Sequence, residues 1–186
     1  MTVGACLFDA QLRRGGKPTS FRLEVLHNDS VAVLAGRAYL GKGALRGRLT
    51  RDSLSLYIPS THEYVDESLQ NLLKSAECSA AEMSLDFLSL LTTLPDAQHH
   101  TTGIDVLPDY SDAGRPTFVV TSAGCLWKLE LTYDHSDSGW RLRELFFTGS
   151  KDVSLNAKRR QCKPAINVSA DKLRFAVPDG AARVIP

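Results

Sequence analysis

The residues best suited to chemistry are the histidines and cysteines, and their spacing gives little support to catalysis. His99 and His100 are neighbours in a polar stretch, with Asp134 and His135 as further candidate ligands. Adjacent loop side chains point in different directions, and no HExxH-like spacing accompanies them, so we expect no metal site. Cys125 with His135 could pair as nucleophile and base, but no oxyanion motif accompanies them. We therefore expect no enzyme and no cofactor.

Four cysteines are spread along the chain, at Cys6, Cys78, Cys125 and Cys162. They form no CxxC pair and have no spacing typical of a zinc site. An even number permits disulfides in an oxidising compartment, and all three pairings remain open.

Composition sets the class of protein. The chain has 186 residues, 43% hydrophobic and 23% charged, which is typical of one globular domain spanning residues 1–186. A net charge of +1 argues against a nucleic-acid partner, whose binding depends on neutralising phosphates. No apolar stretch reaches the roughly 18 residues that a membrane helix needs.

The elements that must position any site are mostly strands. Alternation of apolar and polar residues predicts strands in the first third of the chain, for example at Phe21-Arg22-Leu23-Glu24-Val25. It returns at Leu129–Tyr133 and Trp140–Phe147, and again at Leu173–Val177. Strands joined by such short turns must pair antiparallel.

The middle of the chain changes period. Leucines in Asp66–Lys74 have helical spacing, and Ser84–Leu91 is apolar on nearly every side, so we predict two helices there. Asp96–Arg115 is expected to be a polar loop. The predicted fold is mostly β with α: a curved antiparallel half-barrel sheet, with the central helices as a lid across its concave face.

This order resembles the LolA and LolB families of periplasmic lipoprotein carriers and outer-membrane lipoprotein receptors. The likeness lies in the strands up to Ile58, interrupted by Tyr39-Leu40-Gly41, in Met83–Ala97 with its Leu-Pro ending, and in Leu129–Phe147 followed by Ile166–Pro178. In these families a helix and a strand precede the strand that matches Phe8–Leu12. We therefore expect that N-terminal elements are missing.

The resemblance implies binding of lipoprotein acyl chains or other lipids, and no enzymatic activity. Each methylene removed from water contributes about 0.8 kcal/mol, so the cavity must be apolar. The candidate lining is apolar throughout: Phe21, Leu23, Val25, Leu45, Leu54, Leu56, Phe87, Leu88, Leu91, Leu129 and Leu131. The resemblance also implies a loop at Leu40 and Lys42 that contacts the membrane, a partner carrier protein, and a periplasmic location with an outer-membrane anchor in the full-length protein.

Two alternatives remain open. The apolar set could be an ordinary packed core, and Arg46 and Arg48 are best explained as a solvated strand face. The same scaffold could also serve as an envelope assembly or sensor module that binds a protein or peptide at an open sheet edge. No ATP-driven step is expected, because Gly16-Lys17 lacks the remainder of a P-loop.

Overall fold

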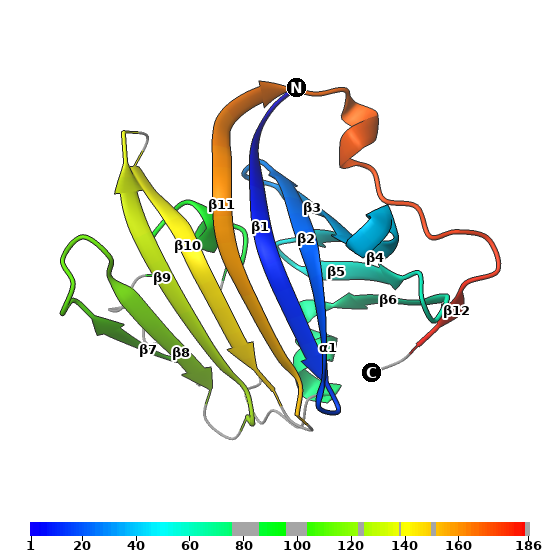
Figure 1. The fold of residues 1–186 in the computed structure, drawn as a ribbon, viewed down its shortest axis with the longest axis horizontal. Coiled ribbons are helices and arrows are strands. Elements are labelled where there is room, and N and C mark those ends of the chain that lie inside the picture. The colour runs from blue at the N-terminus through cyan, green and yellow to red at the C-terminus, as the bar shows by residue number, and fades with distance from the viewer. Residues whose placement is uncertain (76–85, 96–103, 123–124, 138, 150–151, 185–186) are drawn as a thin grey trace.

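The computed structural model describes residues 1–75, 86–95, 104–122, 125–137, 139–149 and 152–184. These residues form a 12-stranded sheet that is curved and not closed into a barrel, since its strand order runs from β12 at one end to β7 at the other (Figure 1). All neighbouring strands are antiparallel except β12 and β6, which are parallel.

One half of the sheet is built from the first third of the chain. Its strands follow one another as a meander, as the alternation predicts for those up to Ile58, and the last of them was not predicted. They are β1 (Thr2–Arg14), β2 (Lys17–His27), β3 (Val31–Ala38), β4 (Gly43–Thr50), β5 (Ser53–Ile58) and β6 (Glu63–Ser68). The first hairpin turns at Gly15 and Gly16, both with positive φ, which is the geometry that two-residue hairpin turns require.

The other half comes from the last half of the chain. Its strands are β7 (Ile104–Asp109), β8 (Thr117–Ser122), β9 (Lys128–Ser136), β10 (Gly139–Thr148) and β11 (Ser154–Asn167). The short last strand, β12 (Ala182–Arg183), returns to the first half, where it pairs with β6 at the end of the sheet. Strand β11 pairs with β1 and so joins the two halves, and the Cys6–Cys162 disulfide crosses this seam. The two long central strands lie at the front in Figure 1.

Of the two predicted central helices, the first is confirmed in part and the described part of the second is wrong. Among the described residues of this region, only α1 (Leu69–Ser75) is an α-helix, and Asp66 to Ser68 belong to β6. The described part of the predicted second helix, residues 86–91, is a turn followed by the single 3-10 turn η2 (Ser89–Leu91). The Asp86 side chain accepts hydrogen bonds from the N–H groups of Leu88 and Ser89, which is the arrangement of a residue that caps the start of a helical turn, so this turn begins after Asp86. A helical lid is therefore not seen in the described ranges.

Two further expectations need correction. The predicted loop Asp96–Arg115 contains β7, which buries Ile104 and Val106. The alternation at Leu173–Val177 does not form a strand, since η3 (Ala170–Leu173) ends there and irregular chain follows. Leu173 instead packs with Val3 and Val31 in a small second core on the sheet face opposite the main core.

Candidate ligand-binding faces of the sheet

The sheet has two chemically different faces. We call the face that bears the main core and residues 86–95 the inner face, and the opposite face the outer face. Cross-strand partners carry apolar side chains across the inner face from one half of the sheet to the other. One such row runs Phe118, Leu131, Leu145, Ala157, Ala10, Phe21 and Ala38. A parallel row runs Cys162, Cys6, Val25, Leu34, Gly47, Leu56 and Val65.

The two halves of the inner face differ in how tightly they are closed. On β8 and β9, Phe118, Val120, Leu131 and Tyr133 have exposed fractions of 0%. On β2 to β5 the leucines keep part of their surface accessible, and these half-buried side chains are Leu23, Leu34, Leu45, Leu49, Leu54 and Leu56. The β2 to β5 part of the inner face is therefore apolar without being fully covered.

Residues 86–95 cover the β8 and β9 part of the inner face. Leu88 and Leu90 join the main core, with Phe87 and Leu91 packed beside them. The Tyr133 hydroxyl donates a hydrogen bond to the Leu90 carbonyl at 2.9 Å. Burial raises the pKa of Tyr133, so this hydroxyl remains a proton donor at every physiological pH. Figure 1 shows this green segment behind β10 and β11.

A hollow of about 510 Å³ lies at one end of the inner face, with Leu88, Arg51 and Arg141 among its lining residues. His27 also lines this hollow and is buried, and its cross-strand partner on β1 is Gly4. A Cβ atom at Gly4 would lie 2.5 Å from the His27 ring, so only glycine fits there. Burial first, and then the Arg141 charge, lower the pKa of His27, whereas Asp29 acts to raise it. The imidazole is therefore held neutral.

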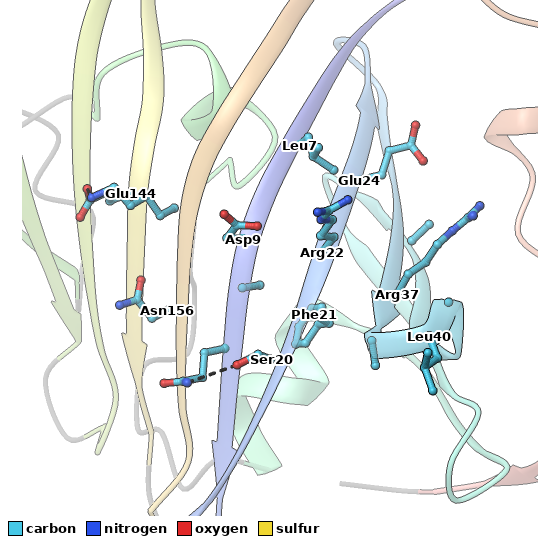
Figure 2. A pocket seen from close by; sticks show the side chains of 16 residues that line it. Leu7, Asp9, Ser20, Phe21, Arg22, Glu24, Arg37, Leu40, Glu144 and Asn156 are labelled. Carbon is cyan, nitrogen blue, oxygen red and sulfur yellow. Dashed lines mark hydrogen bonds and ion pairs between the residues drawn. The ribbon is translucent and has the colours of Figure 1, made fainter.

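A larger hollow, of about 1000 Å³, lies on the outer face and has a charged floor. Figure 2 shows Asp9, Arg22, Glu144 and Asn156 on neighbouring strands across it, with Leu40 at one side. In the register, Glu144, Lys158, Asp9, Arg22 and Arg37 form one row over β10, β11, β1, β2 and β3.

Charges on the β9 to β1 part of the outer face are paired. Arg159 binds Asp134 through two contacts of 2.5 and 2.7 Å, and Arg143 also reaches Asp134 at 3.2 Å. Within the row, Lys158 pairs with Glu144 at 2.8 Å. The remaining acid of the row, Asp9, pairs with Arg160 at 2.6 Å. Across the rest of the row, Arg22 faces Arg37 directly.

Leu40 sits in η1 (Tyr39–Gly41) between β3 and β4, and 81% of its surface is exposed. Its φ of 63° lies in the left-handed region, which a leucine adopts at a cost of about 1 kcal/mol. Lys42, which follows this turn, is also exposed. Leu40 lines the outer hollow together with Arg22 and Arg37.

The predicted lining residues come together on the inner face. Phe21, Val25, Leu88, Leu129 and Leu131 are buried members of the main core. Those packed against that core or placed on the same face by register are Leu23, Leu45, Leu54, Leu56, Phe87 and Leu91. Neither hollow is lined by this set as a whole, since only Phe21 borders the outer hollow and only Leu88 the smaller one.

Sequence reasoning missed both hollows. The sequence of a single strand does not predict the outer hollow, because its row of charged residues forms only when five strands are aligned. His27 is the last residue of β2. Its position two residues beyond Val25 in the same alternation was the available signal.

The candidate chemical clusters do not assemble in the described structure. His99 and His100 lie outside the described residues, and His135 makes an edge-to-face contact with Trp140. Cys125 is disulfide-bonded, so it offers no thiolate. Within the described ranges no three His, Cys, Asp or Glu side chains are grouped to hold a metal ion, and no helix there is long and apolar enough to span a membrane.

No protein-family model matches the sequence, and no curated protein matches it. Several solved structures share its general shape at low similarity. An uncharacterized conserved protein from Thermus thermophilus is 15% identical, with a TM-score of 0.45 over 97% of this chain and 89% of the other. A DUF1329 family protein from Desulfovibrio piger is 10% identical, with a TM-score of 0.49 over 93% and 89%. A LolA superfamily protein from Nitrosomonas europaea is 11% identical, with a TM-score of 0.42 over 94% and 90%.

Proposed function

We propose that this chain is a non-enzymatic lipid-binding protein that holds an acyl chain against the inner face of its sheet. The observation that carries the proposal is the difference between the two halves of that face. On β8 and β9 the inner-face side chains of Phe118, Val120, Leu131 and Tyr133 are at 0% exposure, whereas the leucines on β2 to β5 are only half-buried. Apolar surface left accessible in this way is available to an apolar ligand.

The open edge of the sheet supports the proposal. A carrier must release its cargo as well as bind it, so a completely sealed core would serve poorly. Strand β12 pairs with β6 through only Ala182 and Arg183, and the sheet does not close. The half-buried leucines on β4 and β5 lie towards this end, where an acyl chain could enter sideways.

We further propose that the chain delivers lipoprotein cargo at a membrane, with Leu40 and Lys42 as the contact. A leucine that is 81% exposed and held in a left-handed conformation gains nothing for the fold. An apolar tip would, however, enter the bilayer interface readily. A periplasmic location fits the Cys6–Cys162 disulfide, because such bonds persist in oxidising compartments.

Lipid binding is tested by purifying the chain from bacterial envelope and analysing it by native mass spectrometry. We expect a fraction with added mass equal to an acyl lipid, which organic solvent removes. Repeated recovery of empty protein that also fails to bind an apolar fluorescent probe would contradict the proposal.

Delivery is tested with two substitutions at the same position. Leu40→Glu should keep the fold and reduce transfer of bound lipid to liposomes, because a charge replaces the apolar tip. Leu40→Phe keeps the tip apolar and should transfer as the wild type does. Equal transfer by both variants would show that this loop does not enter the membrane.

The alternative function is a module that binds a peptide by strand addition. Strand β7 lies at the end of the sheet, and Leu107 on it is 62% exposed. Pro108, which has no N–H to donate, weakens this edge as a template. An empty protein that captures an extended peptide along β7 would favour the module over the carrier.

A further inference from the structure

A group of cations gathers on the outer face of β2, β3 and β4 and in the turn beside them. Arg22, Arg37, Lys42 and Arg46 are all exposed, and the exposed acid Glu24 lies among them. We call Arg22, Arg37 and Arg46 the arginine patch. The whole chain has a net charge of only +1, so this is a local group of cations and not part of a generally basic surface.

The arginine patch lacks the pairing found on the neighbouring strands. Arg22 and Arg37 are directly opposite each other on adjacent strands, an arrangement in which like charges destabilise a sheet. In the described part of the chain, no hydrogen bond or ion pair is made by the side chains of Arg22, Arg37 or Arg46. By contrast, Arg159, Lys158 and Arg160 each meet a carboxylate.

Leu40 gives the patch an apolar border. It lines the same 1000 Å³ hollow as Arg22 and Arg37, and its side chain is almost fully exposed. Figure 2 shows Leu40 below Arg37 at the edge of the hollow, with the two side chains pointing in different directions and Arg22 on the next strand. One guanidinium group can donate hydrogen bonds to two oxygens of the same phosphate, and an apolar side chain can enter the hydrocarbon of a bilayer. The combination therefore matches a phospholipid surface.

We infer that the arginine patch binds phosphate groups of anionic phospholipids and makes membrane docking selective for an anionic bilayer. This inference rests on the proposed function in that both place the chain at a membrane, but it concerns the outer face and requires no cargo. The arginines would neutralise lipid phosphates while Leu40 enters the interface beside them. The inner face stays free to hold an acyl chain during docking.

The test is sedimentation of the full chain with two kinds of vesicle, neutral phosphatidylcholine and a mixture with phosphatidylglycerol. Wild type should bind the anionic vesicles much more tightly, and added salt should weaken that binding. Arg22→Gln/Arg37→Gln should lose about 30-fold in affinity, since each basic side chain near an anionic surface contributes roughly fivefold. Arg115→Gln/Lys128→Gln removes the same charge at the β7 to β9 end and should bind nearly as wild type does.

Three results would overturn the inference: equal binding to both kinds of vesicle, no binding to either, or equal losses in the patch and control variants. Competition by soluble glycerol phosphate at low millimolar concentration would instead assign the patch to a free phosphate ligand, and would also overturn it. An apolar-probe titration of the same variants separates the two proposals. If the wild type binds the apolar probe but not the vesicles, only the proposed role of the arginine patch is rejected. If the wild type does not bind the probe, the proposed lipid-carrier function is rejected.

Discussion

Both the backbone conformation and the exposure of residue 40 are unfavourable for a leucine. A φ of 63° is tolerated best by glycine or asparagine, and an exposed leucine gains no burial in return. We therefore predict that Leu40→Asn leaves the free energy of unfolding unchanged or raises it by up to about 1 kcal/mol. A denaturant titration measures this. A loss of more than about 1 kcal/mol would show that Leu40 stabilises the fold.

His27 should make stability depend on pH. Its pKa is lowered in the folded chain by burial and by Arg141, so protonation favours the unfolded chain, where the pKa is near 6.5. The stabilisation from a neutral His27 is complete above pH about 6.5 and is lost as the pH falls below that value. The urea midpoint of the wild type should therefore fall between pH 7.5 and 5. In His27→Gln the fall should be smaller, and an identical fall would exclude His27 as its source.

At the scale of elements, a buried hydrogen bond ties the segment of residues 86–95 to the sheet. Tyr133→Phe leaves the Leu90 carbonyl without its partner and should lower stability by about 1–2 kcal/mol. Faster hydrogen exchange at residues 88–91 should accompany it. Tyr110→Phe is the control, because Tyr110 is 60% exposed. Equal effects of the two changes would show that the buried bond contributes nothing.

The elements also show how far the sequence leads. The meander from Thr2 to Ile58 follows from alternation and glycine turns, and the structure confirms it. Strand β7 could not be recognised, because Pro108 and the aspartates around it read as a loop. In the described part of the helix expected at 84–91 only the 3-10 turn η2 forms, because periodicity reports which residues are buried and not how many helical turns the backbone makes.

The candidate site, too, could be predicted only in part from the sequence. Alternation identified inner-face residues such as Leu56 and Leu131, since one face of each strand had to be apolar. It could not distinguish a sealed position from a half-buried one, because exposure depends on what the rest of the chain lays over that face. The pairing of Arg22 with Arg37 could not be predicted from the sequence either, since it depends on the register of β2 against β3.

At the scale of the whole molecule, the seam between β1 and β11 holds the two halves of the sheet together. The Cys6–Cys162 disulfide crosses it between residues 156 positions apart. Closing so long a loop restricts the unfolded chain, and Cys6→Ala/Cys162→Ala should lower stability by about 2–4 kcal/mol. Denaturant titrations under non-reducing conditions measure the loss. An unchanged midpoint would mean that strand pairing alone holds the seam.

The central claim is that the half-buried leucines of β2 to β5 bind an apolar ligand. Its most direct test is titration of an apolar fluorescent probe into Leu56→Glu, with Ala35→Glu as the matched control. Both variants add one carboxylate to neighbouring parts of the sheet, the first on the inner face and the second on the outer face. We predict that Leu56→Glu remains folded by circular dichroism and loses probe binding, while Ala35→Glu binds as the wild type does. Unchanged probe binding in folded Leu56→Glu would contradict the claim.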